Sequence, residues 1–191
     1  MPVQFDDFVI GPVRLGLLPH PGGRGEPAAR DWLAGRLGVD GAALPLERDL
    51  HGRPRLGDPD RDCNWSHSGP WLLVALADRA RVGVDIEAMR PRPRALEIAR
   101  RYFHPREAEV LAALPAGARD AAFLRLWCAK EAVLKAHGRG LAHGLDRFEV
   151  AGFAGDGEAL RIARDDGGLG PGWALAELDC PQAVAVVAWR A

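Results

Sequence analysis

The order of strand-like and helix-like segments constrains the fold of this chain more than any other feature of its sequence. Two segments rich in Val, Leu and Ile, at 71–77 and 81–87, precede three helical segments at about 94–103, 105–113 and 118–137. Four further strand-like segments follow, at 147–152, 159–164, 173–179 and 183–190. Strands and helices therefore come in blocks without βαβ alternation, which favours an α+β fold with antiparallel sheets.

The amino-terminal part gives weaker signals. One strand pattern lies around 13–18, a turn-rich stretch covers 19–23, and 27–38 reads as a short helix that starts near a proline and stops at a glycine. The segment 45–64 is polar and rich in Pro and Asp, so we expect a loop there. The 191 residues suit one globular domain, or two small halves that share a core.

Composition excludes several classes of protein. The formal net charge of −1 argues against a generally basic nucleic-acid binder, although it leaves room for a local cationic pocket. The longest apolar runs are too short to cross a bilayer, and the first residues lack the pattern of a signal peptide. The three cysteines are widely spaced and form no Cys-x-x-Cys pair. We therefore expect a cytoplasmic protein without structural zinc or a disulfide framework.

A pair of acids closes the segment 81–87. On a strand, residues two apart point to the same face, so Asp85 and Glu87 are expected to lie side by side. Two adjacent carboxylates repel each other, and a divalent cation such as Mg²⁺ would relieve the repulsion. For the pair alone, two solvated acids at a strand end is the simpler alternative.

The third predicted helix carries the only two lysines among 25 basic residues. At helical spacing, Trp127, Glu131 and Lys135 share one side. Lys130 falls within an apolar arc, where a lysine must either reach solvent or meet an anion. A surface ion pair between Glu131 and Lys135 explains the second lysine but not the first. A compact ammonium suits a cramped phosphate contact, although the two lysines could also be neighbours by chance.

Two further stretches offer donors for an anion. In 64–69, Ser66, His67 and Ser68 are small donors at the edge of a predicted strand, and a polar turn is the simpler alternative. A Ser-His-Asp hydrolase is disfavoured, because no Gly-x-Ser-x-Gly is present and adjacent Ser and His point to opposite faces of a strand. In 51–56, Arg53 could grip an anion, against the alternative of a plain Gly-Pro turn.

Together these motifs resemble those of the 4'-phosphopantetheinyl transferases, in particular the longer, Sfp-type branch. That family shows Gly-Lys-Pro, Asn-x-Ser-His-Ser, Gly-x-Asp-x-Glu, Trp-x-x-Lys-Glu-Ala-x-x-Lys and Gly-x-Gly-Leu in this order. The chain matches them at 52–54, 64–68, 83–87, 127–135 and 138–141. Each motif is weak alone, but five in order, at matching spacing across 50–150, are specific.

The resemblance implies a monomer of two pseudo-symmetric α+β halves, 1–88 and 89–191, each a small antiparallel sheet packed against helices. The active site would lie in the cleft between them. Such enzymes use CoA and Mg²⁺ and move 4'-phosphopantetheine onto a serine hydroxyl of an apo acyl or peptidyl carrier protein, as holo-acyl-carrier-protein synthases do. Adenosine 3',5'-bisphosphate is the other product. The implied partners are carrier proteins of fatty acid, polyketide or nonribosomal peptide synthesis, with no nucleic acid and no membrane.

The resemblance also implies residue roles. The metal ligands would be Asp85, Glu87 and Glu131. The catalytic residues would be Glu131, Lys135 and His67, with Glu131 as the most plausible acceptor of the serine proton. Contacts to CoA would come from Arg30, Arg53, Ser66, His67, Lys130 and Lys135. At position 53 an arginine replaces the family's lysine, which keeps the charge but changes the geometry.

The chain departs from the family pattern at its start, where a helix with basic residues usually holds the 3'-phosphate and adenine of CoA. A catalytically silent CoA- or carrier-binding homologue is therefore one alternative, against which the complete acid triad and both lysines argue. An unrelated metal-dependent nuclease or phosphatase using Asp85 and Glu87 is another. The near-neutral charge and the lack of other acid clusters with histidine disfavour it.

Overall fold

The computed structural model describes residues 6–155, 157–180 and 182–191. Its helices are α1 (Glu26–Leu37), α2 (Ala95–Tyr102), α3 (Pro105–Ala113) and α4 (Ala116–His137), with short 3₁₀ turns at Gly41–Ala43 and Gly140–His143. Its strands are β1 (Asp6–Ile10), β2 (Val13–Pro19), β3 (Leu46–Arg48), β4 (Pro54–Leu56), β5 (Arg61–Ser68), β6 (Trp71–Asp78), β7 (Arg81–Ala88), β8 (Phe148–Ala151), β9 (Arg161–Asp165), β10 (Ala174–Cys180) and β11 (Ala183–Arg190).

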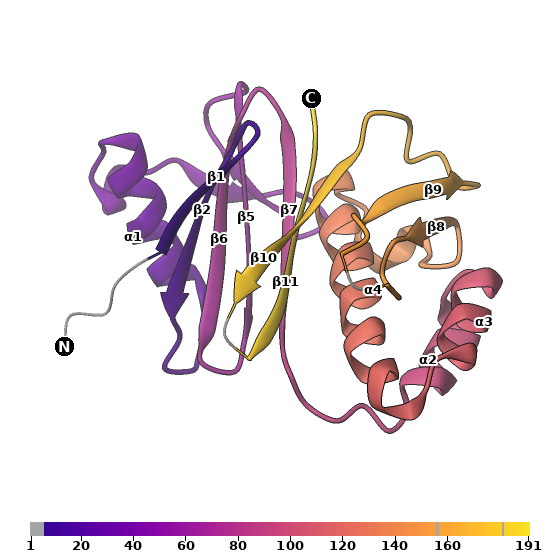
Figure 1. Cartoon of the computed structure of the whole chain (residues 1–191). Coiled ribbons are helices and arrows are strands. Elements are labelled where there is room, and N and C mark those ends of the chain that lie inside the picture. Colours follow the sequence, from indigo (N-terminus) through magenta and orange to yellow (C-terminus); the bar gives the residue numbers. More distant parts are fainter. Residues whose placement is uncertain (1–5, 156, 181) are drawn as a thin grey trace.

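The strands form small antiparallel sheets, which confirms the expected α+β class. A four-stranded sheet has the order β1-β2-β6-β5, and a three-stranded sheet has the order β10-β11-β7. Two ribbons, β3-β4 and β8-β9, complete the set. In Figure 1, α1 lies on the outer side of the four-stranded sheet, while α4 runs beside β7 and β11 with α2 and α3 beyond it.

The predicted helices and late strands agree with the structure to within a few residues. The segment 45–64, expected to be a loop, instead contains β3, β4 and the start of β5, so that prediction was wrong. The polar 64–69 stretch is mostly strand as well, and β1 was not predicted. Short strands with polar side chains give little periodic apolar signal, which explains these misses.

Strand β7 joins the two sheets in different ways on its two edges. On one edge it pairs with β11 through the backbone over its whole length. On the other edge β5 contributes side chains: the Asp62 carboxylate accepts from Val82 N at 2.8 Å, and Asn64 Oδ1 accepts from Val84 N at 3.0 Å. Polar side chains of β5 thus take the place of a backbone ladder. The two predicted segments, 1–88 and 89–191, consequently share a sheet, and their boundary stays a prediction.

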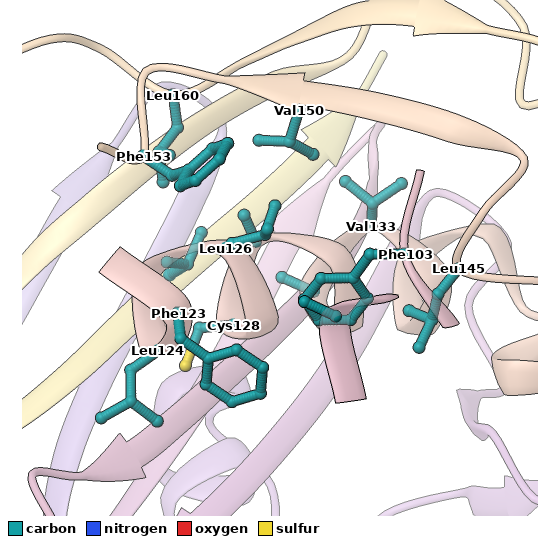
Figure 2. Close-up of a cluster of buried hydrophobic side chains, with 14 of the residues drawn as sticks. Phe103, Phe123, Leu124, Leu126, Cys128, Val133, Leu145, Val150, Phe153 and Leu160 are labelled. Atoms are coloured by element: carbon teal, nitrogen blue, oxygen red, sulfur yellow. The ribbon is translucent and has the colours of Figure 1, made fainter. Parts of the chain in front are cut away.

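Three clusters of buried apolar side chains hold these layers together. One lies under α1, against the outer face of the four-stranded sheet. A second fills the space between β2, β6, β7 and β11. The third surrounds α4 and includes Phe103, Phe123 and Leu126, as Figure 2 shows. Helix α4 is therefore anchored on one side by this third cluster and faces β7 on another.

The approach of α4 to β7 is closest at Gly83. A Cβ added there would lie 2.1 Å from the carbonyl oxygen of Ala132 and 2.5 Å from the backbone nitrogen of Ala136. Both atoms belong to the helix backbone, so no side-chain rotation can relieve the clash. A glycine at this position lets the strand carry Asp85 close to α4.

Replacing Gly83 by alanine is expected to lower the free energy of unfolding by about 1–3 kcal/mol or more, because the added methyl group overpacks two backbones. Chemical denaturation measures the effect. Gly35→Ala in α1 is the matched control, since nothing lies within 4 Å of a Cβ built there. If Gly83→Ala were as stable as Gly35→Ala, the close approach would be contradicted.

Candidate active site

The site is centred on Asp85, near the end of β7. Its side chain is 7% exposed, and its Oδ1 accepts hydrogen bonds from Ser66 Oγ at 2.8 Å and Lys135 Nζ at 2.6 Å. Its Oδ2 is buried and has no hydrogen-bond partner among the described residues. A buried carboxylate oxygen without a partner is costly, so this atom marks a place for an additional donor or a cation.

Glu87 lies on the same face of β7, as the strand period predicts. It is only partly buried, with 27% of its side chain exposed. Its Oε2 accepts from Ser68 Oγ at 3.1 Å and from Arg92 Nη2 at 2.8 Å. Ser66 and Ser68, two residues apart on β5, thus each contact one of the two acids.

Glu131 faces this pair from α4. Burial raises the pKa of its carboxyl, Lys135 opposes that shift, and the charges of Asp85 and Glu87 raise the pKa further. Like charges from a strand and a helix therefore act on one another at this point. The structure thus shows that the charges of Asp85 and Glu87 act on Glu131. We call these three residues the three-carboxylate site.

The donor set of this site fits Mg²⁺ in its chemistry. All three ligands would be carboxylate oxygens, which hard cations prefer, and Asp85 Oδ2 lacks a partner. Within the described ranges, however, no three His, Cys, Asp or Glu side chains meet closely enough to hold an ion as they stand. Lys135 and Arg92 neutralise Asp85 and Glu87 instead. Metal ligation by these residues therefore stays a prediction that requires their side chains to move.

Lys135 links the site to a neighbouring pocket. Its Nζ donates to Ser66 Oγ at 2.9 Å and to the Val84 carbonyl at 3.1 Å, besides Asp85. The pocket has a volume of about 220 Å³ and is lined by residues from β3, β4 and the turn between them, from β5, and from α4 and the segment after it, among them Arg48, Arg53, Trp65 and Gly138. An anionic ligand in this pocket would lie within reach of the ammonium.

His67 lies between Ser66 and Ser68 and therefore points to the opposite face of β5. Its ring is exposed, and the ring of His20 lies 4.4 Å away between centroids. Burial, then His20, then Lys135 lower the pKa of His67. The charge of Lys135 therefore reaches His67, although His67 projects from the face of β5 opposite to Ser66 and Ser68.

Arg53 is largely engaged in holding the two sheets and α4 together. Its guanidinium pairs with Asp62 and donates to the carbonyl oxygens of Lys135 and Val82, both at 2.9 Å. Only 6% of the residue is exposed, although it lines the 220 Å³ pocket. A contact between Arg53 and CoA stays a prediction, now restricted to the exposed edge of the side chain.

Arg30 is not brought to the site. Its guanidinium donates to the carbonyl oxygens of Gly41 at 3.1 Å and Leu44 at 2.8 Å, and to Leu46 at 3.4 Å. It thereby fastens the segment after α1 to that helix. These bonds give Arg30 a structural role, and its contact with CoA stays a prediction.

Lys130 is enclosed within the protein. The residue is 0% exposed, and its Nζ lies 2.8 Å from Glu107 and donates to the carbonyl oxygens of Leu145 and Phe148, each at 2.7 Å. It also lies 4.1 Å from the centroid of the Phe148 ring. Protein groups therefore surround the ammonium, and its contact with CoA stays a prediction that would require these groups to move.

Glu107 on α3 is the residue that the sequence reasoning missed. Its carboxylate accepts from Lys130 and from the backbone N–H groups of His104 at 3.0 Å and Val150 at 2.7 Å. Burial raises its pKa to about 7, against the opposing charge of Lys130. The signal was present, since a lysine inside an apolar arc must either reach solvent or meet an anion. The anion that Lys130 meets is Glu107, a residue of the protein itself.

The structure is an α+β fold in which strand β7 faces the long helix α4. The three-carboxylate site and Lys135 lie on these two elements. A model of the 4'-phosphopantetheinyl transferase superfamily matches residues 81–177, a range that contains all three carboxylates and Lys135. The chain belongs to this superfamily. None of the helices in the described part of the chain is both long and apolar enough to cross a bilayer.

Individual relatives agree with this assignment. The 4'-phosphopantetheinyl transferase HetI of Nostoc sp. is 35% identical over 170 residues, covering 85% of this chain and 68% of the relative. A putative 4'-phosphopantetheinyl transferase of Synechocystis sp. is 40% identical over 123 residues, covering 63% and 50%. The transferase Sfp of Bacillus subtilis is 34% identical over 127 residues, covering 66% and 55%. The matches thus span between half and about two thirds of these relatives.

Proposed function

We propose that this protein transfers the 4'-phosphopantetheine group of CoA to a serine hydroxyl of an apo carrier protein. The observation that carries the proposal is the arrangement around Asp85, whose buried Oδ2 has no partner among the described residues, whose Oδ1 pairs with Lys135, and whose charge acts on Glu131. Membership of the superfamily supports the reaction type. The silent, merely binding homologue has no feature in its favour, because the acids and Lys135 are all present.

The proposed step forms one P–O bond and breaks another. The serine oxygen attacks the phosphorus that bears pantetheine, and the P–O bond to the second phosphate of the diphosphate breaks. Adenosine 3',5'-bisphosphate leaves, and the serine proton goes to a carboxylate, which we assign to Glu131. Burial raises the pKa of Glu131, which makes its carboxylate a stronger proton acceptor than a solvated glutamate.

Other residues would position the substrate and stabilise charge. Lys135 lies between Asp85 and the 220 Å³ pocket, so its ammonium can bind a diphosphate oxygen where negative charge develops. Ser66 and Ser68 hold the acids in place by hydrogen bonds. Mg²⁺, held by Asp85, Glu87 and Glu131, would supply charge neutralisation at the diphosphate.

The decisive experiment mixes the purified protein with CoA, Mg²⁺ and an apo carrier protein, and then measures the mass of the carrier. We expect a phosphopantetheine adduct on its serine, and no adduct when that serine is replaced by alanine. A panel of acyl and peptidyl carriers tests which class is served, including the holo-acyl-carrier-protein synthase activity. No adduct on any carrier would refute the proposal. Gel filtration and cell fractionation test the monomeric, cytoplasmic form that we propose.

A further inference from the structure

A cavity of about 440 Å³ lies at the end of β7 that is remote from Asp85 and Glu87. Its walls come from β4, the start of β5 and the loop between them, from the turn before β7, and from the end of β11, which lies near that turn at the top of Figure 1. The volume is within the range of about 300–1,000 Å³ that is typical of small-molecule sites. We call it the arginine cavity after five of its lining residues: Arg55, Arg61, Arg79, Arg81 and Arg190.

The walls of the arginine cavity are tied together without a ligand. The backbone N–H of Arg79 donates to the carbonyl oxygen of Asp60 at 2.6 Å, which joins the turn before β7 to the loop before β5. Arg61 Nε lies 3.5 Å from the carboxylate of Asp58 and 3.4 Å from that of Asp78, so one guanidinium joins the same loop to the end of β6. The cavity is therefore preformed, and a ligand would not have to order these segments.

The charges that line the arginine cavity do not balance. The side chains of Arg55, Arg79 and Arg81 make no hydrogen bond or ion pair with any residue that the structure describes. Asp60 is the one acid side chain of the wall that is unpaired within the same ranges, because the other acids of the wall are bound by arginines. Three guanidiniums against one carboxylate leave an excess of two positive charges. Arg81 is half-buried, so its charge lacks full hydration as well as a partner.

The arginine cavity is separate from the 220 Å³ pocket beside Lys135. Asp62 lines the first and Arg53 lines the second, and the buried ion pair between these two residues forms the partition. Arg81 precedes Asp85 by four residues on β7, which places their two Cα atoms about 13 Å apart. A ligand of the arginine cavity therefore need not displace CoA from the site proposed for it.

Arg79 adopts a backbone conformation that arginine rarely takes. Its φ of 53° lies in the left-handed region, which glycine takes without strain and asparagine takes more readily than most residues. A non-glycine residue held there carries a cost in backbone energy, and such residues cluster at functional sites. This position thus retains a guanidinium on the cavity wall although a smaller residue would fit the turn better.

We propose that the arginine cavity binds a phosphate monoester that carries hydroxyl groups, such as a sugar phosphate. A phosphate monoester has a charge of about −1.5 to −2 at pH 7, which matches the excess of two positive charges. Guanidinium groups bind phosphate oxygens in a bidentate manner. The cavity is larger than a phosphate group needs, so there is room for an organic body whose hydroxyls can donate to Asp60. This ligand lies outside the proposed transfer reaction.

Calorimetry at low ionic strength tests the inference with ribose 5-phosphate, ribose and inorganic phosphate as probes. We expect ribose 5-phosphate to bind, inorganic phosphate to bind more weakly, and ribose not to bind. Arg79→Asn should weaken binding of ribose 5-phosphate about tenfold without lowering the melting temperature of the free protein, because asparagine tolerates the left-handed backbone. Arg81→Gln should weaken binding as well. The matched control is Arg100→Asn, at an exposed arginine of α2 outside the cavity, which should leave binding unchanged.

Competition with CoA gives a second readout. The affinity for ribose 5-phosphate should be the same with and without saturating CoA and Mg²⁺, because the two ligands occupy different sites. Displacement by CoA would place the sugar phosphate in the substrate site and overturn the inference. Equal affinities for ribose 5-phosphate and inorganic phosphate would also overturn it, as would equal binding by the wild type, Arg79→Asn and Arg100→Asn. None of these measurements uses a carrier protein, so their outcome is independent of the proposed transfer reaction.

Discussion

Replacing Glu107 by alanine is expected to lower the free energy of unfolding by about 3–5 kcal/mol. The change leaves the ammonium of Lys130 fully buried without its anion, between α4 and β8. Burial already lowers the pKa of Lys130, and Glu107 is the main opposing charge. Removing that charge therefore forces the chain either to bury a lone cation or to deprotonate the lysine. Chemical denaturation at constant pH measures the loss.

A double variant separates the charge effect from simple loss of packing. Changing Glu107 to leucine and Lys130 to methionine removes both charges and keeps apolar volume in the site. The double variant is expected to recover much of the stability lost in Glu107→Ala, because no unpaired charge remains. A single variant as stable as the wild type would show that the buried pair contributes nothing, contrary to the geometry.

The second large effect is expected at Glu131. Glu131→Gln should reduce kcat for phosphopantetheine transfer by about 10²- to 10³-fold, because a neutral amide is a poor metal ligand and cannot accept the serine proton. The free energy of unfolding should change little, since the side chain of Glu131 makes no hydrogen bond with another residue that the structure describes and its carboxylate feels the charges of other acids. Single-turnover rates with a carrier protein measure the loss.

Glu109→Gln is the matched control for this substitution, because Glu109 is exposed on α3 and away from the three-carboxylate site. It should transfer at the wild-type rate. Removal of Mg²⁺ by a chelator should stop transfer in the wild type, and added Mg²⁺ should restore it. Near-normal turnover in Glu131→Gln would rule out both roles that we assign to this carboxylate.

The helices were predictable because proline and glycine residues mark their ends. Pro105 opens α3, and Gly138, in a left-handed conformation with φ of 92°, closes α4. The strands β6, β7 and β11 were predictable because they are rich in Val, Leu, Ile and Ala, and such segments are typical of buried strands. For these elements, local residue choice and burial agree.

Strand β5 was not predictable from apolar periodicity. Its inward residues include Asp62 and Asn64, which are buried because they bind the backbone N–H groups of β7. A pattern of this kind looks like a loop until the neighbouring strand is known. The polar side chains are buried through a tertiary contact, which no local window of sequence contains.

The candidate site was predictable in part. The sequence correctly placed Asp85 and Glu87 on one face of a strand, and for Lys130 it left two alternatives, solvent or an anion. It assigned that anion to the substrate, whereas Glu107 on another helix supplies it. Motif spacing records which residues occur together along the chain. It does not say which element of the fold packs against each side of α4.

The pairing frame of β5 against β6 has a consequence for function. Ser66 lies opposite Leu73 and His67 opposite Leu72, and the hairpin closes at Gly69, whose φ is 56°. A slip of one residue would exchange the two faces of the strand and send both serines outward and the histidine inward. The hairpin turn therefore keeps Ser66 and Ser68 on the face that contacts Asp85 and Glu87, and His67 on the opposite face. Substitutions at Gly69 that shift the register should therefore break the contacts of Ser66 with Asp85 and of Ser68 with Glu87.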